Sequence, residues 1–288
     1  MSTASEFSKT FRLGGDLEVN RMGYGAMRIT GPEIWGMPEN PQNSIDVLRR
    51  AVELGVNFID TADQYGPFTS EQLIGEALHP YAGDVVVATK GGLVRFGPWG
   101  DINNDASPQH LHEALDGSLR RLKLERIDLY QLHRIDPKVP VERSFGFLKE
   151  AQQEGKVRHI GLSEVSVEEI KKAEEFFEVV SVQNRYSMYN REWESVLEYC
   201  VQQNIAFIPW FPIGGGMDAK SDEIISRIAS EKNATVHQLA LSWLLHRAEN
   251  ILLIPGTSNI SHLEENMKAG NIVLSEKDRE ALDQIGKR

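Results

Sequence analysis

Four ionisable residues follow short apolar segments of the chain, and their types suit acid–base chemistry on a carbonyl group. The four are Asp60, Tyr65, Lys90 and His133. A carboxylate at the end of a buried strand is costly to bury without a partner, so Asp60 requires a cation nearby. Parallel strands of a barrel bring their carboxyl ends, and the residues that follow them, to one face. The spacing therefore predicts that the four side chains meet on that face.

Together these side chains could reduce a carbonyl group. A carbonyl whose carbon accepts a hydride needs a proton at its oxygen, and tyrosine, with an ordinary pKa of about 10, is a weak acid. A nearby ammonium lowers that pKa, a role that fits Lys90 beside Tyr65. Asp60 would hold Lys90, while His133 would orient and polarise the substrate carbonyl. Each residue alone has an ordinary structural explanation, and only the combination is specific.

The elements that would position these residues repeat about every 30 residues, the length of one strand and one helix. Eight short segments have the composition of buried strands: Arg21–Met27, Val56–Ile59, Val85–Thr89, Ile127–Leu132, Val157–Leu162, Val179–Val182, Ile205–Ile208 and Ile251–Ile254. The pattern predicts an α/β fold, a (β/α)8 TIM barrel. The alternative is a doubly wound open sheet, but no Gly-x-Gly-x-x-Gly follows the first strand.

Helical periodicity fills the spaces between the strands. Helices are predicted around 45–52, 71–78, 111–122, 141–153, 193–200 and 236–244, and from about 166, 261 and 276. Ser107 precedes Pro108 as an N-cap before N1, and Ser166 with Glu169 forms a capping box. Before the first barrel strand, Gly14-Gly15-Asp16 predicts the turn of an N-terminal β-hairpin over the barrel floor.

Composition narrows the functional classes. The chain has 288 residues, 41% of them apolar, and a net charge of −11, which disfavours nucleic acid as a partner. Cys200 is the single cysteine and follows a helical apolar stripe, so we expect an inert core thiol in a reducing compartment. No apolar run has the length of a signal peptide or a membrane span. We expect a disordered segment 1–10, one domain over 11–288 and a cytoplasmic location.

The motifs GVNFIDTADQYG, VVVATKGG, IDLYQLHR, GKVRHIGLSE, VVSVQNRYS, PWFPIGGG and ILLIPGTSNISHLEEN resemble those of the aldo-keto reductase superfamily. The resemblance extends from about Phe11 to Gly286. It implies a catalytic tetrad in which Tyr65 is the proton donor, Lys90 its partner, Asp60 the ion-pair partner of that lysine, and His133 the substrate-orienting residue. It also implies a nicotinamide dinucleotide held without the Rossmann fingerprint.

The resemblance further implies a set of cofactor contacts. These are Ala26, Met27, Asp60, Ser163, Glu164, Gln183, Trp210, Phe211, Pro212, Ile213, Gly214, Gly256, Thr257, Ser258, His262, Glu265 and Asn266. Ser163 and Gln183 would hold the nicotinamide carboxamide, and Trp210 would stack on the ring. The family usually has asparagine where this chain has Glu164, so the amide donor is missing there.

Cofactor choice depends on how the 2′-phosphate of NADPH would be held. Family members that favour NADPH usually use a lysine and an arginine, and those positions correspond to Gly256 and His262. Thr257 and Ser258 lie just before a predicted helix N-terminus, which attracts phosphate without formal charge. We therefore expect NADPH to be preferred over NADH by a reduced margin, with a protonated His262 adding to that preference.

Within the superfamily the chain is most similar to the bacterial pyridoxal reductase group, through NRMGYGAMRITGP, FPIGG and LLIPGTSNISHLEEN. This implies reduction of small aldehydes or ketones to alcohols, pyridoxal among them. Aromatic residues on long loops, Trp35, Phe96 and Trp99, are predicted to line the substrate pocket. The alternative is a cofactor-binding regulatory subunit like the potassium-channel β-subunits. We expect a monomer or weak homo-oligomer and no metal, since no histidine pair has ligand spacing on a strand end.

Overall fold

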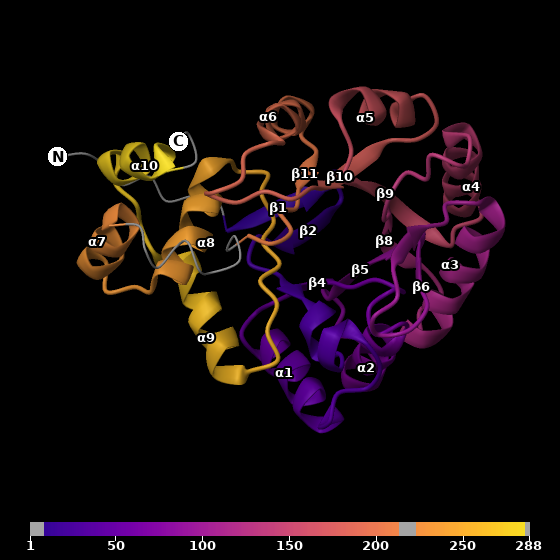
Figure 1. Ribbon diagram of the computed structural model, residues 1–288, viewed down its shortest axis with the longest axis horizontal. Helices are drawn as coiled ribbons and strands as arrows, with labels where there is room; N and C mark the ends of the chain where they lie inside the picture. Colours follow the sequence, from indigo (N-terminus) through magenta and orange to yellow (C-terminus); the bar gives the residue numbers. More distant parts are fainter. Residues whose placement is uncertain (1–8, 213–222, 286–288) are drawn as a thin grey trace.

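Parallel strands curl into a barrel at the centre of the molecule (Figure 1). The computed structural model describes residues 9–212 and 223–285. The sheet runs in the order β3 (Tyr24–Gly25), β4 (Phe58–Asp60), β5 (Val86–Gly91), β8 (Ile127–Leu132), β9 (Val157–Ser163), β10 (Val179–Gln183) and β11 (Ala206–Phe207).

The segment after the last strand closes this sheet. Ile251 makes a parallel bridge to Phe207, and Leu253 makes a parallel bridge to Met22. The backbone N–H of Gly23 donates to the carbonyl of Leu253 at 2.8 Å. Residues 251–254 therefore occupy the eighth strand position, although they pair through isolated bridges. The predicted (β/α)8 barrel is confirmed.

Helices form a ring outside the strands (Figure 1). They are α1 (Pro41–Glu53), α2 (Thr69–Leu78), α3 (Pro108–Leu122), α4 (Val141–Gln153), α5 (Val167–Glu174), α6 (Glu194–Gln203), α7 (Glu223–Glu231), α8 (Val236–Arg247), α9 (Ile260–Lys268) and α10 (Glu276–Asp283). The Ser107 hydroxyl accepts from the His110 N–H, and Ser166 and Glu169 form a complete capping box, as predicted. Helix α7 was not predicted.

The N-terminal hairpin covers the barrel floor. Strands β1 (Thr10–Leu13) and β2 (Leu17–Asn20) pair in antiparallel fashion, starting at Thr10 where a disordered residue was expected. The side chains of Leu13 and Val19 are fully buried in one cluster with inward-facing strand residues such as Phe58. Asp16 in the turn lies 2.7 Å from the His159 ring near the start of β9. The prediction for residues 1–8 lies outside the described residues.

The first strand and the loop after β5 differ from the prediction. Only Tyr24 and Gly25 of the expected strand 21–27 form β3, and Ala26–Ile29 form a short 3-10 helix, η1. A Cβ on Gly25 would lie 2.6 Å from the carbonyl oxygen of Ile254, so glycine is needed for the close packing of the barrel wall at this position. The loop after β5 contains an unpredicted hairpin, β6 (Leu93–Arg95) and β7 (Ile102–Asn104).

The predicted core thiol is confirmed. Cys200 on α6 is completely buried, and burial raises the pKa of its thiol to about 12. A thiol with that pKa stays protonated at neutral pH and is a poor nucleophile. Within the described residues no helix is both long and apolar enough to cross a bilayer.

Candidate active site

A buried ion pair at the carboxyl ends of two neighbouring strands forms the centre of the site. The Lys90 Nζ lies 2.6 Å from Asp60 Oδ2, and the two side chains are 0% and 2% exposed. The same ammonium donates to the Thr61 carbonyl at 2.8 Å and to the Tyr65 hydroxyl at 3.2 Å. Its three N–H bonds are thus directed at three oxygens, which offsets the cost of burying the charge.

Strand register explains why these groups meet. Asp60 ends β4, and β4 pairs in parallel with β5, which carries Lys90 near its end. Two further strands supply amides to the second carboxylate oxygen. Asp60 Oδ1 accepts from Gln131 Nε2 at 3.2 Å and from Gln183 Nε2 at 2.8 Å. Asp60 therefore joins side chains from β4, β5, β8 and β10 across the barrel mouth.

The electrostatics of the pair favour a charged lysine and a protonated tyrosine. Burial lowers the pKa of Lys90, but Asp60 and Tyr65 act in the opposite direction, and the net result is a pKa above its ordinary value. Burial raises the pKa of Tyr65 more than Lys90 lowers it, so the net direction is upward. Lys90 acts on Tyr65 in the direction expected from the sequence, but burial outweighs it, so the phenol keeps its proton and can act as an acid.

His133, just after β8, stands beside the tyrosine in neutral form. Burial, followed by the charges of Lys90 and Arg134, holds the pKa of its imidazole well below the ordinary value. Its ring centroid lies 6.0 Å from that of Tyr65 in an edge-on arrangement, and its buried Nδ1 has no hydrogen-bond partner among residues 9–212 and 223–285. A neutral imidazole can donate one hydrogen bond to a carbonyl oxygen.

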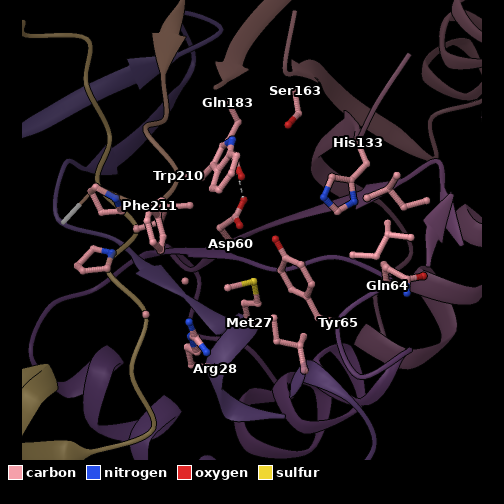
Figure 2. Close-up of a pocket in the computed structure, with 18 of the residues that line it drawn as sticks. Met27, Arg28, Asp60, Gln64, Tyr65, His133, Ser163, Gln183, Trp210 and Phe211 are labelled. Atoms are coloured by element: carbon pink, nitrogen blue, oxygen red, sulfur yellow. Dashed lines mark hydrogen bonds between the residues drawn. The ribbon is translucent and has the colours of Figure 1, made fainter. Parts of the chain in front are cut away.

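These groups face a cavity of about 620 Å³ at the barrel mouth (Figure 2). Its wall is formed by Gly25, Met27, Arg28, Ile34, Asp60, Gln64, Tyr65, Leu93, Arg95, Ile102, His133, Arg134, Ser163, Gln183, Trp210, Phe211, Pro212, His237, Ile254, Pro255 and Gly256. All four residues singled out from the sequence lie together, and three of them reach this wall while Lys90 lies behind it.

Comparison with known proteins identifies the family. The profile of the Aldo/keto reductase family matches residues 21–287. The chain belongs to that family. An uncharacterized oxidoreductase of Schizosaccharomyces pombe is 50% identical, covering 95% of this chain and 89% of that protein. Pyridoxine 4-dehydrogenase of Escherichia coli is 42% identical, covering 97% and 99%.

A solved structure in the same family carries a cofactor. The aldo-keto reductase of Klebsiella pneumoniae in complex with NADPH superposes on this chain with a TM-score of 0.81 at 28% identity. The match covers 96% of this chain and 94% of the other. The barrel, the family and the class of enzyme, an oxidoreductase, are therefore established together.

The residues expected to contact a cofactor fall into four groups. Those in the cavity wall are Met27, Asp60, Ser163, Gln183, Trp210, Phe211, Pro212 and Gly256. Thr257 and Ser258 line an adjoining hollow. Ile213 and Gly214 lie outside the described residues. The remaining expected residues, which neither wall includes, are Ala26, Glu164, His262, Glu265 and Asn266.

Glu164 has a structural role that its sequence position did not reveal. Its backbone has a φ of 55°, in the left-handed region. Its carboxylate Oε1 accepts from the Trp210 indole Nε1 and from the Arg185 backbone N–H, each at 2.6 Å. The glutamate thus holds the tryptophan ring at the cavity wall. An asparagine side chain is one methylene shorter and would not place its oxygen at the same position.

The aromatic residues predicted to line the substrate pocket are not in the cavity wall. Phe96 and Trp99 are each 81% exposed on the β6–β7 hairpin. Trp35 packs against the Arg95 guanidinium at 5.8 Å from its ring centroid. Apolar contact comes from other residues of the same loops, among them Leu93 and Ile102. The antiparallel pairing of β6 and β7 decides which side chains of this loop face the cavity.

Several wall residues were not singled out from the sequence. They include Arg28, Gln64, Arg95, Arg134 and His237. Arg134 could have been noticed, because it directly follows His133 in the motif IDLYQLHR. His237 on α8 and Arg28 on η1 carry no such signal, since only the closed barrel brings them to the mouth.

Proposed function

We propose that this protein is an NADPH-dependent reductase of small aldehydes and ketones. The observation that carries the proposal is the chain of contacts from Asp60 through Lys90 to Tyr65, whose hydroxyl reaches a cavity beside a neutral His133. This arrangement supplies a proton donor and a hydrogen-bond donor to the same carbonyl oxygen. Nothing in the proposal depends on a metal ion.

Each residue has a separate part in the reaction. The Tyr65 hydroxyl donates its proton to the substrate oxygen as negative charge develops there, and the ammonium of Lys90 stabilises the resulting phenolate. Asp60 keeps Lys90 charged and fixes its Nζ near Tyr65. His133 orients the carbonyl, which must be positioned before transfer. When bound, the reduced nicotinamide supplies the hydride.

The described residues fit a nicotinamide dinucleotide. Gln183 donates its amide N–H to Asp60, which leaves the side-chain carbonyl able to accept from a carboxamide. The catalytic cavity and the adjoining hollow share Met27, Arg28, Ile34 and Gly256, so the two lie next to each other. The hollow adds Thr257 and Ser258, whose hydroxyls suit phosphate, and Arg28 offers a permanent positive charge.

The proposal extends to the substrate, the preferred cofactor, the location and the oligomeric state. Pyridoxal is our first candidate substrate, because pyridoxine 4-dehydrogenase is 42% identical over nearly the whole chain. NADPH is proposed over NADH because Arg28 can supply charge where Gly256 and His262 do not form a lysine–arginine clamp. A single cysteine fits the reducing cytoplasm. We also retain the expectation of a monomer or weak homo-oligomer.

A direct assay tests the proposed activity. Purified protein is mixed with NADPH and one aldehyde at a time: benzaldehyde, a short aliphatic aldehyde or pyridoxal. The loss of nicotinamide absorbance is followed, and the assays are repeated with NADH. We expect turnover with at least one of the three and slower turnover with NADH. NADPH binding without turnover of any of them would instead favour the regulatory-subunit alternative.

A further inference from the structure

Arg134 is a charged residue of the cavity wall that the proposed reaction does not use. It follows His133 directly and is partly buried. Its Nη1 donates to the Ser163 hydroxyl at 2.9 Å and to the His133 carbonyl at 2.5 Å. A guanidinium has five N–H groups, so three remain, on Nε and Nη2, without a partner among the described residues.

The charge of Arg134 is also uncompensated at close range. Among residues 9–212 and 223–285 no carboxylate lies within 4.0 Å of it. Burial lowers its pKa, and only the more distant Glu164 and Tyr65 act in the opposite direction. A partly buried cation without a counter-ion carries a desolvation cost, which an anionic ligand would relieve.

Another arginine of the cavity wall, Arg95, differs from Arg134 in its hydrogen bonds. Arg95 donates through Nε to the Gly100 carbonyl, through Nη1 to that of Glu33 and through Nη2 to that of Pro98. Each nitrogen of its guanidinium therefore binds the loop backbone, and the side chain has a structural explanation. For Arg134, three N–H groups have no such structural explanation among the described residues.

We propose that Arg134 forms a subsite for an anionic oxygen on the substrate, close to the reacting carbonyl. The subsite rests on the proposed function, because the carbonyl must lie between the Tyr65 hydroxyl and the His133 ring. Arg134 lines the same cavity as Tyr65 and His133, and its Nη1 is hydrogen-bonded to the His133 carbonyl, so its free N–H groups belong to the cavity that would hold that carbonyl. The anionic oxygen, a carboxylate or a ring oxyanion, would then lie on the carbon next to the one that bears the carbonyl group.

The planar fork of arginine favours such a group over a neutral hydroxyl. Hydrogen bonds between a guanidinium and a charged oxygen are shorter and stronger than neutral ones, and they are frequently bidentate. The substrate class is therefore an aldehyde with an adjacent anionic oxygen. Both 2-carboxybenzaldehyde and pyridoxal, whose ring oxygen neighbours the aldehyde, have this feature.

The test compares two matched pairs of substrates in the wild type and in Arg134→Gln. The pairs are 2-carboxybenzaldehyde with benzaldehyde, and pyridoxal with pyridine-4-carboxaldehyde, which lacks the ring oxygen. For each protein the ratio of kcat/KM within a pair is measured, so the fraction of free aldehyde cancels between proteins. We expect at least one ratio to fall by about 10- to 100-fold in the variant, as loss of a charged hydrogen bond requires.

Two controls make the comparison specific. Arg143→Gln removes the same charge from an exposed position on α4, and both ratios should stay at the wild-type value. With 4-carboxybenzaldehyde, whose carboxylate is remote from the aldehyde, Arg134→Gln should have a smaller effect than with the 2-isomer. A fall in the carboxylate pair alone assigns the subsite to carboxylates, and a fall in the pyridoxal pair alone assigns it to ring oxyanions.

Two results would contradict the proposed subsite. If Arg134→Gln lowers kcat/KM equally for both members of each pair, the guanidinium only orders Ser163 and the subsite is refuted. That outcome leaves the reductase proposal intact, because the neutral aldehydes are still reduced by the wild type. If the wild type reduces none of these aldehydes, the reductase proposal fails, and the subsite fails with it.

Discussion

Asp60→Asn isolates the buried ion pair on which the site is built. The substitution keeps the size of the side chain but leaves the Lys90 ammonium, 0% exposed, without its counter-charge. It also replaces one accepting oxygen by an amide NH2 group, which can only donate. That group would face either the amides of Gln131 and Gln183 or the Lys90 ammonium, all of which are donors. Removing one partner of a buried pair costs about 3 to 5 kcal/mol, and we expect a loss in that range.

Urea unfolding at pH 7 measures this loss, with a double-mutant cycle to assign it. Lys90→Met alone leaves a buried carboxylate and should also destabilise the protein. In Asp60→Asn with Lys90→Met neither charge remains, so the combined loss should be smaller than the sum by about 2 kcal/mol. Glu231→Gln breaks the exposed pair with Arg227 and should leave the free energy of unfolding near the wild-type value.

The sign of the pH dependence follows from the lysine. Its pKa in the folded protein is raised above the ordinary value of 10.5, so its contribution to stability is complete below that value. The contribution is lost as the pH rises through the higher, folded-state pKa. The stability that Lys90 contributes in the wild type should therefore be the same at pH 7 and pH 9. An Asp60→Asn variant as stable as wild type, or strictly additive losses, would refute the reasoning.

The remaining predictions concern the cofactor. Glu164→Leu removes the acceptor of the Trp210 indole N–H and should raise the Kd of NADPH by about tenfold, whereas Glu164→Gln, which keeps an acceptor, should lose less. Equal Kd values for both variants and wild type, by fluorescence titration, would contradict the tethering role. Arg28→Gln should also raise the Kd of NADPH about tenfold. An unchanged Kd in that variant would exclude Arg28 from phosphate binding.

The meeting of Asp60, Lys90 and His133 at one site could be predicted from the sequence because strand ends in a barrel are geometrically equivalent. Asp60, Lys90 and His133 each end or follow an apolar run, and parallel register brings such positions to one rim. Gln131 lies one position before the last residue of β8 and points to the same centre, yet a lone glutamine inside an apolar strand gives no signal of its own. Its role depends on the distance to Asp60, which only the closed barrel defines.

The loops were harder to predict because their conformation depends on contacts between distant residues. Phe96 and Trp99 were expected in the pocket as large apolar side chains, but pairing of β6 with β7 leaves both at 81% exposure. From the sequence, Glu164 was expected only to lack the amide donor of the asparagine that the family usually has there. Its left-handed backbone turns the carboxylate toward Trp210, 46 residues along the chain, and that contact is invisible in a linear motif.

The pKa of Tyr65 shows a similar limit. The sequence indicated that an ammonium beside the phenol would lower its pKa, and the contact of 3.2 Å is present. Burial acts in the opposite direction and is the larger effect, which no spacing of residues reveals. A phenol that stays protonated until a substrate oxygen develops charge is consistent with an acid that acts in the transition state.

The most direct measurement of the central claim is the effect of Tyr65→Phe on turnover and on cofactor binding. We predict that kcat/KM for a neutral aldehyde falls by about 10²- to 10⁴-fold, the usual contribution of a general acid. The Kd of NADPH should stay within about twofold of wild type, because the phenol acts on the substrate oxygen. Tyr199→Phe, which removes a hydroxyl bonded to Glu174 on the surface, should match wild type in both measurements. Near-normal turnover in Tyr65→Phe would contradict the assignment of Tyr65 as the proton donor.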